Sequence, residues 1–267
     1  MNRETLLEEV HAPAYAKPIE LYAFIDPLCP TCWALQPMLR RLQVEYERYF
    51  TLRIALRTTL PKINGLCFNK KEDPKASEKS HPSFPSLAIK AAEFQGKRAG
   101  FRFLSKLYEY TFLKSRDVSS LSVLIEIAEK MELDVNEFVL DFSSHNVMRS
   151  LQVDLYLANE MEVCDAPTFV FFNENIEDEG LKVDGLYSYE IYEQILEELI
   201  GQRITPNIPP TLEELFCRFD SFATKEIAEI YRISEKAAER ELKKQLLQQN
   251  VERLPFQEMT IWRKKVN

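Results

Sequence analysis

The chain has 267 residues, 45% of them hydrophobic, which is enough for one large domain and a smaller one with buried cores. Its formal net charge of −8 argues against a general nucleic-acid-binding protein and against attraction to anionic membranes. No run approaches the ~20 apolar residues of a membrane span, and glutamates stand where a signal peptide needs apolar residues. We expect a cytoplasmic protein that binds neither nucleic acid nor membrane.

The most informative stretch is DPLCPTCW, residues 26–33, which follows the apolar run 21–25. Two cysteines separated by two residues, between a strand and a helix-like segment, indicate a thioredoxin-type redox site. The first helical turn after a strand can hold two sulfurs close together and expose one, which is expected to be Cys29, and free N–H groups and the helix dipole are expected to favour its thiolate. Half of a zinc site is the alternative to the pair Cys29 and Cys32, and it needs two further ligands. No second such pair exists, and the other candidates lack ligand spacing: Cys67, Cys164, Cys217, His11, His81 and His145. We expect no metal and no cofactor.

The elements around this motif predict an α/β fold. Residues 19–25 form a nearly continuous apolar run, as expected for a strand buried on both faces. A helix is expected over 34–48, and the strict alternation of 51–57 predicts a second strand. This order requires a parallel pair with a right-handed crossover, which places Cys29 at the carboxyl edge of the first strand.

The sheet pattern then stops, and an all-helical insertion is expected over about residues 65–146. The charged segment 70–80 predicts a loop, whereas the apolar periodicity from Ser86 onward is helical. Asp134 is expected to cap the last of these helices. Many aromatic residues lie here, and their helical spacing favours core packing over a ligand pocket.

A second informative stretch begins at Cys164, after a helix predicted over 147–161. Pro167 immediately precedes the apolar strand that starts at Thr168, and a proline suits the first residue of a strand. The peptide bond before Pro167 could be cis or trans, and the residues alone leave both open. A short strand over 181–187 and an amphipathic helix over 189–200, which Gly201 ends, complete this part.

Residues 202–210 contain three prolines and predict a linker. Beyond it we expect helices over 212–219, 225–231 and 235–249, the last two capped by Thr224 and Ser234, and short strands over 251–254 and 259–262. Three helices with a closing hairpin describe a winged-helix-like arrangement. The third helix mixes glutamates with lysines and arginines, which is more typical of a protein-binding face than of a phosphate-binding one.

The first motif, the helical insertion and the Ala-Pro-Thr strand together resemble the DsbA branch of the thioredoxin superfamily over about residues 19–201. Four segments are more specifically similar to the SpxH (YjbH) family of ClpXP adapters: DPLCPTCW, KAAEFQGKRAGFRFL (90–104), FFNENIEDEGLKVDGLYSYEIYEQIL (171–196) and ATKEIAEIY (223–231). The chain departs from the family in one respect. Members can carry a histidine-rich, zinc-sensitive N-terminus, and only His11 stands there in this sequence.

The resemblance implies a cytoplasmic, non-enzymatic adapter that binds the transcription regulator Spx and promotes its degradation by the ClpXP protease. It places Cys29, Cys32 and Pro167 at the redox pair and the cis-proline, and implies that delivery needs no catalytic residue. The alternative from the residues is a cytosolic DsbA-like thiol-disulfide oxidoreductase. The expected organisation is a flexible N-terminus (1–18), a DsbA-like domain (19–201), a linker (202–210) and a winged-helix-like interaction domain (211–267).

Overall fold

The computed structural model describes residues 18–58, 80–175, 179–256 and 259–265. Its centre is a mixed four-stranded sheet of order β2-β1-β3-β4. The strands are β1 (Ile19–Ile25), β2 (Phe50–Leu56), β3 (Thr168–Phe172) and β4 (Leu181–Asp184). β1 pairs parallel with β2 as predicted, whereas β3 runs antiparallel to both β1 and β4. The thioredoxin-like architecture expected from the sequence is therefore present.

Helices cover both faces of this sheet. Leu21 and Ala23 of β1 face α2 (Gln36–Tyr46) and α8 (Tyr189–Ile200), and Phe24 faces the opposite side, where α7 (His145–Glu160) packs. This alternation is the period of two that an extended strand imposes on its side chains. Because helices cover both faces of the sheet, both sets of side chains are buried, and the sequence of β1 is therefore apolar nearly throughout.

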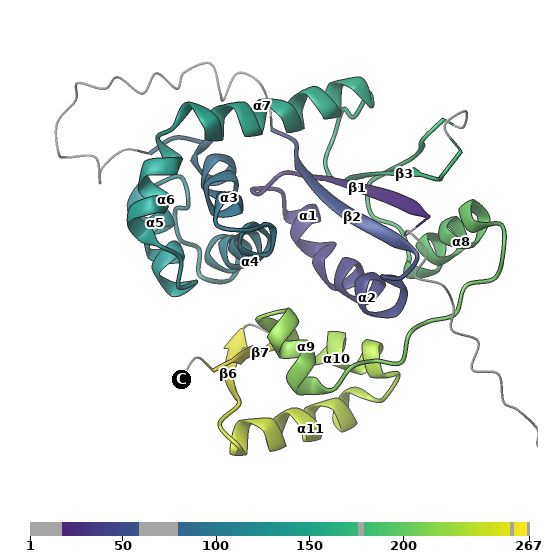
Figure 1. Ribbon diagram of the computed structural model, residues 1–267. Helices are drawn as coiled ribbons and strands as arrows, with labels where there is room; N and C mark the ends of the chain where they lie inside the picture. The colour runs from purple at the N-terminus through teal and green to yellow at the C-terminus, as the bar shows by residue number, and fades with distance from the viewer. Residues whose placement is uncertain (1–17, 59–79, 176–178, 257–258, 266–267) are drawn as a thin grey trace, which may run out of the picture.

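Between β2 and β3 the described residues form helices joined by turns and loops; the first of these helices lie together beside the sheet, and α7 runs back over it (Figure 1). They are α3 (Phe84–Phe94), α4 (Lys97–Tyr108), the π-helix η3 (Glu109–Leu113), α5 (Leu121–Lys130), α6 (Val135–Phe142) and α7. The aromatic residues Phe103 and Phe138 stack with ring centroids 5.5 Å apart and are fully buried. Core packing is thus the main role of the aromatic residues here, as their spacing predicts.

Several predicted helix ends are confirmed by their hydrogen bonds. The side chain of Asp134 accepts from the backbone N–H of Glu137, and Ser234 caps α11 (Glu235–Leu247) in the same way. Gly201 adopts a left-handed conformation with φ of 71° at the end of α8, which a residue without Cβ adopts at no steric cost.

One expected helix is present with a separate short helix before it, and one expected cap is wrong. The helix expected over 34–48 is α2, and α1 (Pro30–Ala34) precedes it as a separate helix, because Pro37 lies in the first turn of α2 and has no N–H with which to continue the ladder. Thr224 does not cap α10 (Thr224–Tyr231) but is its first residue. Its hydroxyl accepts a 2.9 Å hydrogen bond from Nε1 of Trp262, while the side chain of Glu226 accepts from the backbone N–H of Ala223 at the start of the helix.

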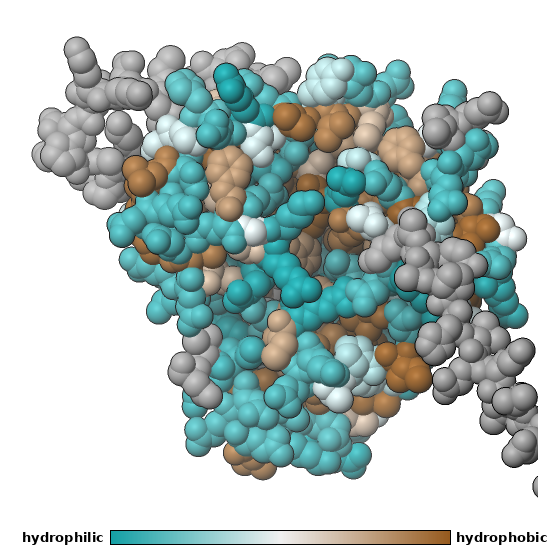
Figure 2. Space-filling view, in the orientation of Figure 1, coloured by the Kyte–Doolittle hydropathy of each residue, from teal (hydrophilic) through white to brown (hydrophobic). Residues whose placement is uncertain are grey.

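The C-terminal part packs beneath α2 (Figure 1). It consists of α9 (Leu212–Arg218), β5 (Ser221–Ala223), α10, α11, β6 (Val251–Phe256) and β7 (Met259–Lys264), with an antiparallel sheet of order β5-β7-β6. Its core surrounds Trp262, which is fully buried. Figure 2 shows that its surface is largely hydrophilic in this view, whereas hydrophobic side chains gather over α7.

Residues 202–210 contain neither helix nor strand, yet they are attached to the preceding part. The N–H of Asn207 donates to the carbonyl of Glu45 at 2.7 Å, and Ile204 is buried. Three predicted segments lie wholly or mostly outside the described residues. They are the flexible N-terminus, the loop over 70–80 except for Ser80, and the first part of the helical insertion. No helix in the described ranges is long and apolar enough to span a membrane.

Candidate functional site

Cys29 lies at the N-terminus of α1, one turn beyond the carboxyl end of β1. Its thiol accepts a hydrogen bond from the backbone N–H of Cys32 at 3.4 Å and donates to the carbonyl of Ala166 at 3.6 Å. Cys29 is half-buried, and both cysteines are free thiols. Cys29 is therefore partly accessible, and its sulfur contacts both α1 and the loop that precedes β3.

Cys32 occupies a different environment one helical turn later. It is fully buried, and its sulfur accepts a 3.5 Å hydrogen bond from the N–H of Asp26. Burial raises the pKa of the Cys32 thiol far above its ordinary value, and that single hydrogen bond only partly opposes the effect. Of the two thiols, Cys29 is therefore the one that can react with a group in solvent, whereas the buried Cys32 can react only with a group already bound at the site.

The third predicted residue lies against this pair. The Ala166–Pro167 peptide bond is cis, and the carbonyl of Ala166 is the group that accepts from the Cys29 thiol. The loop is fixed by Thr168, whose hydroxyl shares its one proton between the carbonyl of Asp165 at 2.9 Å and the carboxylate of Asp184 at 2.8 Å. The structure therefore brings Cys29, Cys32 and Pro167 together although more than 130 residues separate the pair from the proline.

The helical insertion supplies one wall of the site. The indole of Trp33 stacks on Phe112, with ring centroids 5.1 Å apart and an interplanar angle of 15°. Tyr108, at the end of α4, is buried and donates its hydroxyl hydrogen bond to the carbonyl of Asp26 at 3.3 Å. Burial raises the pKa of Tyr108 well above its ordinary value, so it stays a neutral donor.

Sequence reasoning assigned Tyr108 and Phe112 to core packing alone and did not foresee their contact with the motif. It also missed Arg57, whose guanidinium donates to the carbonyls of Val163 and Cys164 and so holds the chain that leads to Pro167. No local pattern marks these residues. Their partners come from other elements, and only the fold brings them within reach.

A chemical capability follows from this geometry. In thiol-disulfide exchange, a thiolate attacks a disulfide sulfur to form a mixed disulfide, which a second thiol then resolves. Cys29 is placed for the first step and Cys32 for the second, although burial disfavours the Cys32 thiolate that the second step needs. Among the described residues, no cluster of three or more His, Cys, Asp or Glu side chains is arranged to hold a metal ion.

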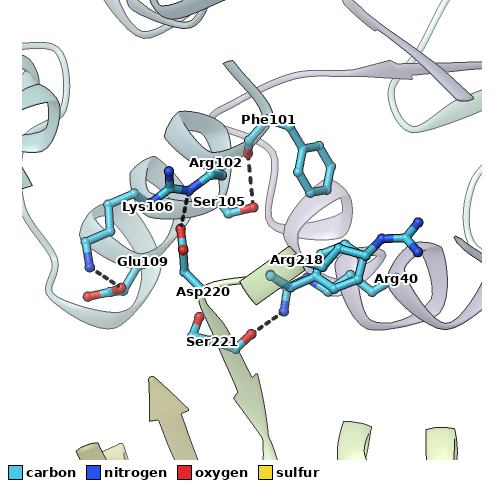
Figure 3. A pocket seen from close by; sticks show the side chains of 10 residues that line it. Arg40, Phe101, Arg102, Ser105, Lys106, Glu109, Arg218, Asp220 and Ser221 are labelled. Carbon is cyan, nitrogen blue, oxygen red and sulfur yellow. Dashed lines mark hydrogen bonds and ion pairs between the residues drawn. The ribbon is translucent and has the colours of Figure 1, made fainter. Parts of the chain in front are cut away.

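A second cluster of charged residues joins the thioredoxin-like part to the C-terminal part (Figure 3). Arg40 of α2 donates to the carbonyl of Ser221 at 2.8 Å and forms a buried ion pair with Glu226 at 3.1 Å. Arg102 of α4 pairs with Asp220 at 3.1 Å. Glu109, at the start of η3, binds three cations, and these are Lys106, Lys114 and Arg263.

Because η3 carries both Glu109 and Phe112, one five-residue helix contacts the C-terminal strand β7 and the wall of the cysteine site. Two of the ion pairs between the parts, Arg40–Glu226 and Glu109–Arg263, are mostly buried, whereas Arg102–Asp220 is exposed. Partners removed from water in this way resist separation more than a surface ion pair does.

Comparison with known proteins places the chain in a family. A thioredoxin family model matches residues 22–194. The chain is 40% identical to the ClpXP adapter protein SpxH of Shouchella clausii over an alignment that covers 92% of this chain and 89% of that protein. The chain belongs to the SpxH family. The SpxH proteins of Bacillus licheniformis and Bacillus subtilis are 41% and 37% identical, each with the same coverage of 92% and 89%.

Solved structures agree with the thioredoxin-like part of this SpxH family member. A double-alanine variant of alpha-DsbA1 from Wolbachia pipientis aligns with a TM-score of 0.51 at 13% identity and covers 69% of this chain and 86% of that one. The oxidoreductase DsbA from Xylella fastidiosa aligns with a TM-score of 0.50 at 17% identity and covers 70% and 88%. At these identities the likeness concerns the fold alone. It supports the DsbA-type architecture expected from the sequence.

Proposed function

We propose that this chain is a cytoplasmic adapter that binds the transcription regulator Spx and promotes its proteolysis by the ClpXP protease. The observation that carries the proposal is the extent of the similarity to proteins named ClpXP adapter protein SpxH. A match over 92% of the chain must include most of the residues beyond 194, where the thioredoxin family model ends. The similarity thus extends into the part that a thioredoxin-like oxidoreductase does not need.

An adapter works through surfaces rather than through catalytic groups. A specific interface buries on the order of 1,200–2,000 Å² in total. Two parts held in a fixed arrangement can together offer a surface of this size to a partner. The buried ion pairs Arg40–Glu226 and Glu109–Arg263 support such a fixed arrangement. We extend the proposal to the domains: a DsbA-like domain (19–201), a linker (202–210) and a winged-helix-like interaction domain (211–267).

Delivery of Spx requires neither Cys29 nor Cys32 in this proposal, and Pro167 serves the shape of the site rather than a reaction. The test is the rate at which purified ClpXP degrades Spx with no addition, with this chain, and with its Cys29→Ser/Cys32→Ser form. A Cys217→Ser form is the matched control, since that thiol is exposed and belongs to α9 in the C-terminal part. Equal acceleration by all three forms is expected. No acceleration by the unaltered chain would refute the adapter function.

The second candidate function is thiol-disulfide exchange. It is favoured by the half-buried Cys29 thiol at a helix N-terminus, 3.6 Å from the carbonyl that precedes Pro167. Its test is reduction of insulin by the chain in the presence of dithiothreitol, with Cys29→Ser as the control. Turnover that depends on Cys29 would establish this activity. Turnover no faster than that of the control would refute the exchange activity and leave the adapter function as the single proposed function.

A further inference from the structure

The outer strand of the main sheet, β4, has one edge without a partner among the described residues. In the order β2-β1-β3-β4 it is terminal, and three of its four residues are exposed. The opposite terminal strand, β2, is covered by α7, and the side chain of Asp154 on that helix accepts a hydrogen bond from the N–H of Leu56 at 2.8 Å. Among the described residues, α7 therefore covers the β2 edge of the sheet, whereas the β4 edge has no covering element.

The register of β3 and β4 identifies the backbone groups at this edge. Thr168 lies opposite Asp184, and the N–H of Gly185 donates to the carbonyl of Pro167 at 2.8 Å, one position beyond. In an antiparallel ladder, hydrogen-bonded and non-hydrogen-bonded pairs alternate. Val183 therefore bonds to Phe169, whereas the N–H and C=O groups of Lys182 and Asp184 point away from β3. None of the hydrogen bonds within the described residues uses these groups.

An apolar shelf lies below the same edge. Tyr189 and Glu193 of α8 face α2, where they bond to Glu45 and Tyr46. At 100° per residue, Ile191 lies about 160–200° around the helix from them, on the flank away from α2. Ile191 is 38% exposed, and Leu186 and Tyr187, which connect β4 to α8, are 45% and 51% exposed. A chain laid along β4 would cover these side chains.

The charges around the edge are mostly negative. Glu179 precedes β4 by two residues, Asp184 ends it, and Glu190 lies in the first turn of α8, and all three are exposed. Lys182 is the one cation of the strand, and its ammonium is engaged by the carbonyl of Glu162 at 2.9 Å. An incoming strand with lysine or arginine at alternate positions would meet complementary charge here.

We propose that the free edge of β4 binds an extended, basic segment of the protein that the adapter delivers, by addition of an antiparallel or parallel strand. The proposal rests on the adapter function. Backbone hydrogen bonds to Lys182 and Asp184 supply affinity, and the shelf of Leu186, Tyr187 and Ile191 receives the alternate apolar side chains of the segment. The acidic residues select a basic segment over an acidic one.

The first test uses a fluorescein-labelled peptide of five Val-Lys repeats and the full chain, titrated by fluorescence anisotropy. Lys182→Pro removes the outward N–H without breaking a bond to β3, and proline is tolerated on edge strands. Lys182→Ala is the matched control, because it loses the same charge and keeps the N–H. We expect Lys182→Pro to bind the peptide about five- to tenfold more weakly than Lys182→Ala, as the loss of one net hydrogen bond implies. Equal affinities would overturn the proposal.

Two further arms of the peptide experiment separate strand addition from charge attraction and from misfolding of the variant. A peptide with alternate backbone amides N-methylated keeps its charge but cannot form a strand ladder, and equal binding of both peptides would overturn the proposal. The melting temperature of each variant shows whether it is folded. If Lys182→Pro does not unfold cooperatively at a temperature near that of Lys182→Ala, a Glu179→Lys/Glu190→Lys form replaces it in the test. It is expected to bind the Val-Lys peptide at least tenfold more weakly, and unchanged binding would overturn the proposal.

The second test repeats Spx degradation by ClpXP with the two Lys182 variants. Slower degradation with Lys182→Pro than with Lys182→Ala is the expected result. Equal acceleration by both would overturn the docking edge and leave the adapter function intact, whereas no acceleration even by the unaltered chain would refute the adapter function itself. Sedimentation of the chain alone completes the set, because a dimer that Lys182→Pro dissociates would show that a second copy occupies the edge and would overturn the proposal.

Discussion

Glu109 connects the two parts of the molecule, and its neutralisation is the perturbation that tests this most sharply. Its carboxylate is 8% exposed and binds the ammonium of Lys106 at 3.1 Å, that of Lys114 at 3.2 Å and the guanidinium of Arg263. In Glu109→Gln the side chain keeps its size and can still accept hydrogen bonds. What it loses is the charge that compensates two cations that are themselves mostly buried.

The expected loss of stability follows from this burial. Breaking a buried ion pair by removal of one partner costs about 3–5 kcal/mol, because the other charge stays buried without compensation. Arg263 keeps a second carboxylate, that of Glu252 at 3.0 Å, so we expect a cost at or just below the lower end of that range, about 2–3 kcal/mol. In a chain of this size that corresponds to a decrease of roughly 5–10 °C in melting temperature.

The same residue predicts a pH dependence with a definite sign. Burial by itself raises the pKa of Glu109, but the positive charges of Lys106 and Arg263 outweigh it, so the pKa of the carboxyl lies below its ordinary value. A carboxyl of this kind contributes stability that is fully present above its unfolded pKa, about 4.3, and is lost as pH falls through its folded pKa. The difference in stability between the wild type and Glu109→Gln is therefore constant from pH 7 to about 5 and decreases below about 4.3.

Differential scanning calorimetry of both proteins at a series of pH values measures these effects. The matched control is Glu20→Gln, which removes an exposed ion pair with Arg53 at 2.8 Å, and it should change the stability by no more than about 0.5 kcal/mol. A Glu109→Gln form no less stable than Glu20→Gln would refute the role assigned to Glu109. So would a difference from the wild type that grows as the solution becomes more acidic.

Three further outcomes are expected. Iodoacetamide should alkylate Cys29 in the native protein and leave Cys32 unmodified until denaturant is added, as peptide mass spectrometry would show; faster modification of Cys32 would contradict its burial. Phe138→Ala should lower the free energy of unfolding in urea by about 3–5 kcal/mol, and Leu140→Ala, at a residue 74% exposed, by less than about 0.5 kcal/mol; similar values for both would contradict the assigned core. Asp134→Ala should cost about 1 kcal/mol through the lost cap, with Asp134→Asn nearly neutral in the same urea titrations, and an equal loss in both would place the effect elsewhere.

The local elements were predictable because their signals are local. The apolar run 19–25, the cap at Asp134 and the left-handed Gly201 each reflect a preference of a few consecutive residues, and the structure has them where the sequence indicates. The pairing of β1 with β2 was also predictable, because the short β-α-β connection leaves few alternatives.

The local signals failed where distant residues compete for the same group. Threonine is a residue type that often caps helices, but the hydroxyl of Thr224 accepts a hydrogen bond from Trp262, 38 residues later, and does not cap the helix. The ion pairs Arg40–Glu226 and Glu109–Arg263 join residues 186 and 154 positions apart, and nothing in their neighbourhoods marks them. The antiparallel direction of β3 was equally inaccessible, since it depends on how the helical insertion returns the chain to the sheet.

The candidate site was predicted only in part, for the same reason. The spacing of Cys29 and Cys32 indicated a thiol pair at a helix N-terminus, and Pro167 was singled out from its place before a strand. The contacts of the pair with Ala166, Tyr108 and the wall that Trp33 forms with Phe112 required the three-dimensional arrangement. Redox roles for Cys29, Cys32 and Pro167 stay a prediction.

The most direct test of the adapter function is the initial rate of Spx degradation by ClpXP as the concentration of this chain increases. The rate should rise with the concentration of this chain and level off once all of the Spx is bound to it, because the chain is similar over 92% of its length to proteins named ClpXP adapter protein SpxH. A rate independent of the concentration of this chain, with ClpXP shown to be active on another substrate, would contradict the account.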